Sequence, residues 1–369
     1  MTEPNDHNLI SIQDLKVHYR SGGGLFSAAK TVKAVDGVSL DIKKGETLGL
    51  VGESGCGKST LGKALLRLTE PTSGKVIYNG QDLASLSNSA MREQRKHLQM
   101  IFQDQYASLN PRMTVGGIIG EPIRTFGLAN GNSVESMVQE LMETVGLSRR
   151  FIKRYPHEFS GGQRQRIGIA RALAVDPEFI VADEPISALD VSIQAQIMNL
   201  MQRLQVEKGL TYLFISHDLR AIRHLSDRVA VMYLGRIVEL AEGRDIYRDP
   251  LMPYTKALIS AVPVPDPEVE SKRTRIILKG DVPSPIDPPS GCHFHTRCQY
   301  AIAECKTITP QLVEIKPRHY AACIRISPEH PNIVENVGAR TNGVYGYRTA
   351  SDEGDGLRQR AAAKSDSES

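Results

Sequence analysis

Residues 52–60 combine glycines, a lysine and hydroxyl side chains at a spacing suited to binding a polyphosphate. The stretch consists of Gly52, Glu53, Ser54, Gly55, Cys56, Gly57, Lys58, Ser59 and Thr60. It matches the pattern Gly, four residues, Gly-Lys-Ser, in which backbone N–H groups and a helix start surround the phosphates. In such a loop the lysine reaches the β- and γ-phosphates, and the serine hydroxyl ligates the bridging magnesium ion. A glycine-rich turn without a ligand is the alternative, but an apolar strand precedes the loop and an apolar helix follows it.

Two further apolar stretches, residues 179–182 and 212–215, end in side chains suited to hydrolysis. Asp183 and Glu184 follow the first stretch, and His217 follows the second closely. In open α/β sheets, ligands bind at the carboxyl ends of the strands. We therefore expect Asp183 in the magnesium shell, Glu184 polarising the attacking water and His217 at the γ-phosphate. The competing interpretations are a solvated helix cap for the paired carboxylates and a structural role for the lone histidine.

A third segment places a serine and two glycines at the start of an apolar-faced helix. Its members are Ser160, Gly161, Gly162 and Gln163. Free N–H groups in the first turn of a helix attract anions, so this segment is a second candidate phosphate site. Standing alone, it would fit a capped surface helix better.

Tyr19 ends a segment of alternating apolar residues, 9–19, that predicts a half-buried strand. An exposed aromatic ring there is a candidate platform for stacking on a nucleotide base. The alternative, an edge-strand tyrosine packing on its own sheet, would be favoured if Tyr19 were considered alone.

Composition describes an ordinary globular protein. The chain has 369 residues, is 40% hydrophobic and 24% charged, and carries a formal net charge of +3, which by itself argues for neither nucleic acid nor anionic membrane. No apolar run approaches the roughly 18 residues of a membrane span, and residues 1–8 lack the pattern of a signal peptide. A cytosolic protein without nucleic-acid partners is therefore expected.

The apolar segments that must position these side chains alternate with helical patterns, and this order predicts an α/β fold. Strands are expected at residues 9–19, 35–42, 48–51, 75–78, 98–102, 179–184 and 212–215. Residues 104–165 contain proline-bearing polar stretches and helical spacing, which predict an inserted helical subdomain. We expect an ATPase-like domain over residues 1–260, a proline-rich extension over 261–330 and a disordered tail over 331–369.

Four of the five cysteines lie in the extension: Cys292, Cys298, Cys305 and Cys323. Five, six and seventeen residues separate them in turn, without the close Cys-x2-Cys pair typical of structural zinc. The extension has few apolar residues, so a metal would supply folding energy that a small core cannot. The spacing favours a 4Fe-4S cluster over zinc, and four unlinked buried thiols are the alternative. Cys56 is expected to be a small filler rather than a nucleophile.

Taken together, the ordered motifs resemble those of ABC transporter ATPases. They are Tyr19, residues 52–60, Gln103, residues 159–163, Asp183-Glu184, residues 187–190 and His217. The resemblance implies a phosphate-loop ABC ATPase core and a head-to-tail dimer in which each ATP lies between the loop of one subunit and the Ser160 segment of the other. It implies adenine stacking by Tyr19, and it adds Gln103 to Ser59 and Asp183 around magnesium. The expected catalytic residues are Glu184, His217, Lys58 and Gln103.

In the same family, the Ser160 segment contacts the γ-phosphate held by the partner subunit. The resemblance assigns that contact to Ser160 and Gly162, and it places Asp190 across the dimer interface. Phe159 stands where the family usually has leucine, which alters packing rather than phosphate contacts.

Residues 103–115, 190–196 and 253–258 are more similar to the ATPase subunits of bacterial dipeptide and oligopeptide importers. The likeness covers about residues 9–323 and departs at Gln105, usually proline, and at Met252, where histidine is common. It implies a peripheral protein at the cytoplasmic face of the inner membrane. The implied partners are a second, different ATPase subunit, two permease subunits that contact residues 104–114, and an extracytoplasmic solute-binding protein.

Three alternatives to peptide import remain at this point: import of another solute such as nickel, a non-transport ABC ATPase, and a non-catalytic nucleotide-binding subunit. The single motif set speaks against the second, and Glu184 with His217 speaks against the third. The importer ATPases also carry a similar Gly-Cys-x-Phe-x-x-Arg-Cys run, here residues 291–298, and some hold a 4Fe-4S cluster.

Overall fold

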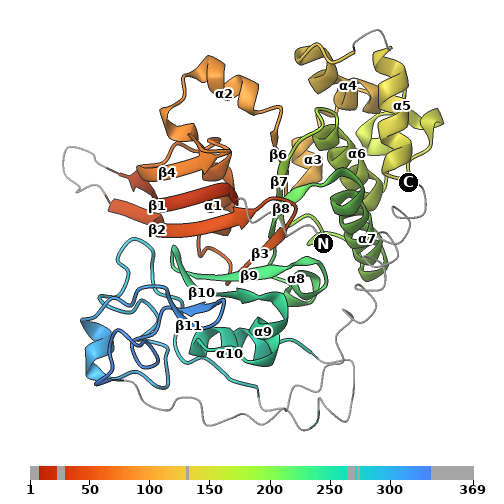
Figure 1. The fold of residues 1–369 in the computed structure, drawn as a ribbon. Helices are drawn as coiled ribbons and strands as arrows, with labels where there is room; N and C mark the ends of the chain where they lie inside the picture. The colour runs from red at the N-terminus through yellow and green to blue at the C-terminus, as the bar shows by residue number, and fades with distance from the viewer. Residues whose placement is uncertain (1–7, 23–29, 130–132, 264–270, 272–274, 334–369) are drawn as a thin grey trace, which may run out of the picture.

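The structure is a computed structural model that describes residues 8–22, 30–129, 133–263, 271 and 275–333. Two sheets organise it (Figure 1). A four-stranded antiparallel sheet has the order β2-β1-β4-β5, and an eight-stranded sheet has the order β11-β12-β10-β9-β3-β8-β7-β6. Their bounds are β1 Asn8–Ser21, β2 Lys30–Lys43, β3 Thr47–Val51, β4 Ser73–Tyr78, β5 Gln81–Asp82, β6 Leu98–Ile101, β7 Phe179–Asp183, β8 Thr211–Ile215, β9 Arg228–Tyr233, β10 Arg236–Glu242, β11 Val313–Lys316 and β12 His319–Ala321. The α/β fold expected from the sequence is confirmed.

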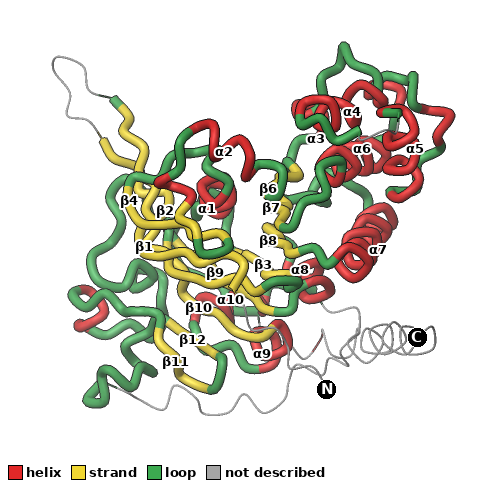
Figure 2. The backbone as a smooth tube through the Cα atoms, turned by 45° about the horizontal axis from the view of Figure 1, so that its top comes forward, coloured by secondary structure: helices red, strands yellow, loops and turns green. Residues whose placement is uncertain are grey.

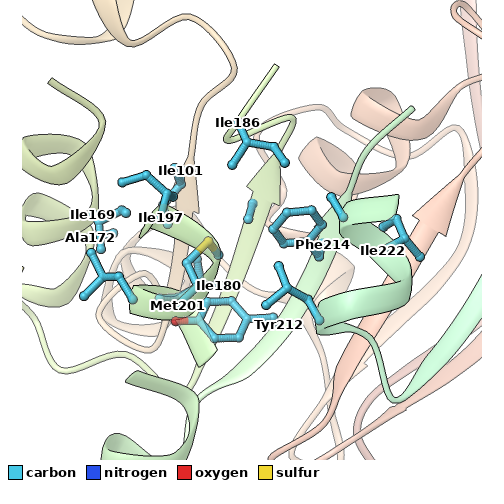
Figure 3. Close-up of a cluster of buried hydrophobic side chains, with 14 of the residues drawn as sticks. Ile101, Ile169, Ala172, Ile180, Ile186, Ile197, Met201, Tyr212, Phe214 and Ile222 are labelled. Carbon is cyan, nitrogen blue, oxygen red and sulfur yellow. The ribbon is translucent and has the colours of Figure 1, made fainter. Parts of the chain in front are cut away.

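The central strands read as continuous apolar runs because both faces of the large sheet are covered. Along β8, Leu213 and Ile215 face the core shared with the small sheet, whereas Tyr212 and Phe214 face the core shared with α7 and α8. Strand β7 alternates in the same way. Figure 3 shows the second of these cores, where Phe214 and Tyr212 pack with Ile180, Ile197 and Met201.

Helices cover both faces of the large sheet and build a separate lobe beside β6 (Figures 1 and 2). Their bounds are α1 Lys58–Leu65, α2 Asn88–Gln94, α3 Gln105–Ser108, α4 Val115–Thr125, α5 Val134–Thr144, α6 Gly161–Leu173, α7 Val191–Lys208, α8 Leu219–Leu225, α9 Gly243–Arg248 and α10 Pro253–Ser260. Helices α3, α4 and α5 pack on α6 and form the helical subdomain expected between residues 104 and 165. Single-turn 3-10 helices lie at Leu83–Ser85, Arg149–Phe151, Pro156–Glu158 and Ala303–Lys306.

The cysteine-containing extension joins the main sheet directly. Strand β12 pairs antiparallel with β10, and β11 pairs with β12, so the extension supplies the last two strands at one edge. Buried Glu239 of β10 fixes this junction: its carboxylate accepts hydrogen bonds from the backbone N–H of Leu251 at 2.7 Å and of Met252 at 2.9 Å, and it pairs with His319 Nε2 at 2.7 Å. The expected disorder after residue 331 falls mostly on residues 334–369, which lie outside the described residues.

Within the described ranges, no helix combines the length and the apolar character needed to cross a membrane.

Candidate active site

Strand order brings the motifs of hydrolysis to one edge of the large sheet. Strands β3, β8, β7 and β6 are parallel neighbours in that order, so their carboxyl ends lie side by side. Leu50 of β3 is in register with Ile215 of β8, and Ile215 is in register with Asp183 of β7. The phosphate loop, Glu184, His217 and Gln103 each follow one of these four strands. The four segments that the sequence predicted for the site therefore meet at one edge of the sheet.

The phosphate loop turns between β3 and α1 by using glycines where side chains cannot fit. Gly57 has φ +109°, and a Cβ added there would stand 2.0 Å from the Ala34 carbonyl oxygen. A Cβ on Gly52, at φ +157°, would stand 2.2 Å from the Met232 carbonyl oxygen. Inside the turn, Lys58 is 5% exposed, and its Nζ donates hydrogen bonds to the carbonyl oxygens of Gly52 at 2.8 Å and Glu53 at 3.0 Å. The ammonium group is thus held at the centre of the loop.

The remaining residues of the loop divide into an exposed tip and a buried floor. Ser54 and Gly55 are exposed, whereas Cys56 is 4% exposed. Burial is the largest influence on the Cys56 thiol and raises its pKa, which disfavours the nucleophilic thiolate. This agrees with Cys56 as a small filler. Thr60 lies in the first turn of α1 and is half-buried.

Ser59 and Asp183 form the pair expected to hold magnesium. Ser59 Oγ donates a hydrogen bond to Asp183 Oδ1 at 2.8 Å, and Asp183 is 4% exposed. Burial raises the pKa of the Asp183 carboxyl, while the Ser59 hydrogen bond and the nearby Lys63 and Lys58 act in the opposite direction. An oxygen pair of this kind suits a hard cation such as Mg²⁺, whose charge would offset the cost of burying the carboxylate.

Glu184 is the meeting point of the other expected catalytic side chains. Gln103 Nε2 donates to Glu184 Oε2 at 2.8 Å, and His217 Nδ1 lies 3.1 Å from Glu184 Oε1. Glu184 has φ +45°, a left-handed conformation that is costly for a residue with a side chain, and its N–H donates to the Ile215 carbonyl at 2.9 Å. The neighbouring strands hold Glu184 in this strained backbone conformation. Its carboxylate lies between the Gln103 amide and the His217 imidazole.

The Ser160 segment lies in a different part of the molecule, at the start of α6. Ser160 and Gln163 form a reciprocal cap: Ser160 Oγ accepts from the Gln163 N–H at 3.3 Å, and Gln163 Oε1 accepts from the Ser160 N–H at 3.0 Å. Gly161 and Gly162 face α7 and the residues just before it, since added Cβ atoms would meet Leu189 and Ile193. The structure therefore shows a capped helix, and the phosphate contacts predicted for this segment stay a prediction.

Asp190 and Tyr19 are described by contacts of their own. Asp190 caps α7, its Oδ1 accepting from the Ile193 N–H at 3.0 Å and from Ser192 Oγ at 2.8 Å. Tyr19 lies on β1 opposite Val32 in the small sheet and is 43% exposed. An exposed ring is compatible with base stacking, which likewise stays a prediction.

Two residues that the sequence did not single out for this site contact the phosphate loop. The Tyr254 hydroxyl of α10 accepts a hydrogen bond from the Glu53 N–H at 2.9 Å, and Arg297 of the extension makes an ion pair with the Glu53 carboxylate. Tyr254 lies in the 253–258 segment that carries the family resemblance, and Arg297 lies in the 291–298 run that contains two of the cysteines. Nothing in their local pattern indicated which loop they would meet.

The four cysteines of the extension line one pocket together with Phe294 and His295. Burial raises the pKa of the Cys292 thiol to about 12 and that of Cys298 to about 11. Among the described residues, no group of three or more His, Cys, Asp or Glu side chains is arranged to hold a metal ion. The four cysteines therefore lie around one pocket, and the metal predicted for them stays a prediction.

Two family models match the chain. Residues 35–187 match the model of the ABC transporter, and residues 238–305 match that of the oligopeptide/dipeptide transporter C-terminal region. The first match covers the phosphate loop through Glu184, and the second covers β10 through Cys305.

Curated relatives extend this likeness over most of the chain. The sequence is 59% identical over 316 residues to the putative oligopeptide transport ATP-binding protein YkfD of Bacillus subtilis, covering 85% of this chain and 94% of that protein. It is 54% identical over 324 residues to the oligopeptide transport ATP-binding protein OppF of Salmonella typhimurium, covering 87% and 97%.

A solved structure shares the cassette. The dimeric ATP-binding cassette MJ0796, bound to ADP and Pi in a post-hydrolysis state, matches with a TM-score of 0.57 and 29% identity, covering 64% of this chain and 99% of that one. From these matches and the site geometry, the chain belongs to the ABC transporter ATP-binding subunits of the oligopeptide and dipeptide transporter family.

Proposed function

We propose that this protein is the ATPase subunit that powers import of short peptides through an ABC transporter. The observation that carries the proposal is the Gln103–Glu184–His217 cluster, which adjoins the Ser59–Asp183 pair at one strand edge. Relatives named for oligopeptide transport, such as AppF of Bacillus subtilis at 54% identity, support the peptide as the transported solute.

The chemistry follows from the positions of the side chains. The loop N–H groups and Lys58 bind the phosphates, and the Glu184 carboxylate accepts a proton from the attacking water. Gln103 and His217 hold Glu184 from two sides, so the base is oriented before water arrives. Ser59 and Asp183 would hold magnesium, which neutralises charge on the phosphates when bound.

A Glu184→Gln variant tests this mechanism. The amide keeps the shape of the side chain but cannot accept the proton of the water, so hydrolysis by the assembled transporter should fall by about 100-fold or more while ATP binding persists. Glu178→Gln, at the amino end of the same strand region, is the matched control and should leave the rate within about twofold. A wild-type rate in Glu184→Gln would remove Glu184 from the catalytic role.

The proposed assembly contains a second, different ATPase subunit, two permease subunits and an extracytoplasmic solute-binding protein, with this chain at the cytoplasmic face of the inner membrane. Relatives named as peptide import or oligopeptide transport ATP-binding proteins support that assembly, and the dimeric state of MJ0796 supports the pairing of cassettes. Affinity purification of this subunit from membranes should recover the permease, and short peptides should then stimulate its ATP hydrolysis. Stimulation by nickel or another solute instead of peptides would reassign the cargo.

For the extension, we propose a 4Fe-4S cluster bound by Cys292, Cys298, Cys305 and Cys323. The four cysteines line one pocket, and four thiolates that meet in one place suit a cluster that takes one cysteine on each iron. Backbone N–H groups of Phe294, Tyr300 and Arg325 also interact with three of the sulfurs, as is common around clusters.

Protein purified without oxygen should be brown and contain iron and acid-labile sulfide. Cys298→Ser should lose both, whereas Cys56→Ser, which changes the cysteine outside the pocket, should retain them. Zinc in place of iron would indicate a structural zinc site, and absence of metal would leave four buried thiols.

A further inference from the structure

The phosphate loop is held from outside the ATPase core by a charged clamp on Glu53. Arg297 Nη1 donates to Glu53 Oε2 at 2.7 Å, and Nη2 donates to Glu53 Oε1 at 3.0 Å. This is a bidentate pair, the strongest geometry available between a guanidinium and a carboxylate. The Arg297 side chain is only 7% exposed and that of Glu53 is 26% exposed, so solvent screens the pair weakly.

The turn that carries Arg297 is anchored by an aromatic cluster formed by Tyr233, Tyr254 and Phe294. Their ring centroids are 4.7 to 5.4 Å apart, and Phe294 is 1% exposed. The Arg297 N–H donates to the Phe294 carbonyl at 3.0 Å, so one turn of the extension carries both the aromatic anchor and the guanidinium. Tyr254 of the same cluster accepts the Glu53 N–H. Glu53 is therefore held at its backbone and at its carboxylate.

Glu53 connects this clamp to the phosphate-binding lysine. Its carbonyl oxygen accepts a hydrogen bond from Lys58 Nζ at 3.0 Å. Its carboxylate also places a negative charge on a loop that must bind a polyanion, and Arg297 neutralises that charge. Without the guanidinium, the Glu53 carboxylate would repel the phosphates. Its side chain would also lose the ion pair that keeps the loop in its binding conformation.

We propose that Arg297 is a positioning residue for ATP binding: acting through Glu53, it neutralises and fixes the phosphate loop. The C-terminal extension thus sets the ATP affinity of its own subunit. This inference rests on the proposed ATPase function.

A double-mutant cycle on Glu53 and Arg297 tests the inference. The affinity of the purified full chain for a fluorescent ATP analogue is measured by equilibrium titration. Arg297→Gln should weaken binding about tenfold, because it leaves the Glu53 charge unpaired. Glu53→Gln should lose less affinity than Arg297→Gln, because it removes the negative charge together with the ion pair, and adding Arg297→Gln to it should cause little further loss. Arg297→Lys, which keeps the charge but not the fork, should lie between wild type and Arg297→Gln.

The control is Arg318→Gln, which removes another arginine of the extension, one whose side chain is 78% exposed and lies 3.5 Å from Glu242. It should leave nucleotide affinity unchanged even if it lowers the unfolding temperature. A wild-type protein that binds no nucleotide would defeat the proposed function itself. Normal affinity in Arg297→Gln, or an equal loss in the Glu53→Gln background, would overturn the positioning role. If Arg297→Gln does not fold, normal affinity in Arg297→Lys overturns it.

Discussion

At the scale of single residues, the candidate active site keeps groups in conformations and environments that cost stability. Glu184 has a left-handed backbone at φ +45°. Asp183 is a carboxylate at 4% exposure, and burial dominates the rise of its pKa. Such costs persist where function requires them, and stability lost there must be supplied by the rest of the fold.

Asp183→Asn should make the protein more stable and less active. Because the folded-state pKa of Asp183 is raised, its ionised form destabilises the folded protein above that pKa, and the penalty disappears as the pH falls below the unfolded value of about 4. The amide removes this charge while its oxygen can still accept from Ser59 Oγ. Thermal unfolding at neutral pH should show a gain of about 1 kcal/mol that shrinks towards pH 4, with magnesium-dependent hydrolysis lost.

Asp176→Asn is the matched control, since the Asp176 side chain is 87% exposed and should give no comparable gain. A lower unfolding temperature for Asp183→Asn at neutral pH would contradict the argument from burial.

At the scale of elements, α6 links three functional segments. Its first turn is the capped Ser160 segment, and Gly162 packs against Ile193 of α7. Further along, Arg171 Nη1 donates to the Ser108 carbonyl at 2.6 Å, and its guanidinium lies 6.0 Å from the Phe102 ring. Phe102 directly precedes Gln103. A displacement of the segment expected to meet the permease can therefore be transmitted to α6 and to the residue that contacts Glu184.

Gly162→Ala should force α6 and α7 apart. The added Cβ would stand 2.4 Å from Ile193 Cγ2, an overlap that costs about 1–3 kcal/mol. Chemical denaturation should show this loss, and the double variant Gly162→Ala with Ile193→Ala should recover part of it because the obstructing methyl groups are gone. Gly161→Ala, whose added Cβ has 3.4 Å to Leu189, is the milder comparison. Additive losses in the double variant would show that packing against Ile193 is not the reason for this glycine.

At the scale of the whole molecule, two of the contacts that bind the extension to the core involve charged or polar groups with little exposure to solvent. One is the Glu53–Arg297 clamp at the phosphate loop, and the other is the buried junction of Glu239 with His319. Figure 2 shows β11 and β12 beside β10, continuous with the main sheet. The extension is thus part of the sheet that positions the candidate active site.

Glu239→Ala should destabilise the whole protein strongly. It would leave the N–H groups of Leu251 and Met252 without their acceptor and His319 Nε2 without its partner, and each buried group left unsatisfied costs about 1–3 kcal/mol. The matched control is Glu242→Ala on the same strand, which removes a solvent-exposed pair with Arg318 at 3.5 Å and should cost less than about 1 kcal/mol. If urea denaturation shows equal losses of unfolding free energy for Glu239→Ala and Glu242→Ala, the buried junction contributes no more to stability than the exposed pair.

The sequence by itself determined the chemistry of this protein and the order of its elements. Glycine and lysine spacing in residues 52–60 and the carboxylates after the residue 179–182 run identify a polyphosphate site because they act locally, through turn geometry and strand ends. Continuous apolar runs likewise identified the central strands β3, β6, β7 and β8, since both faces of the sheet are buried there, whereas strands β9 to β12 were not predicted. These signals lie within a few residues of one another, where the chain itself fixes the distance.

The tertiary structure decided which of those residues meet. Gln103 and Glu184 meet because β6 and β7 are neighbours, and Glu53 meets Arg297 across 244 residues of sequence. It also engaged Ser160 and Asp190 in helix caps. Contacts of this kind depend on strand order and on how the extension folds back, and no local pattern of residue types encodes either.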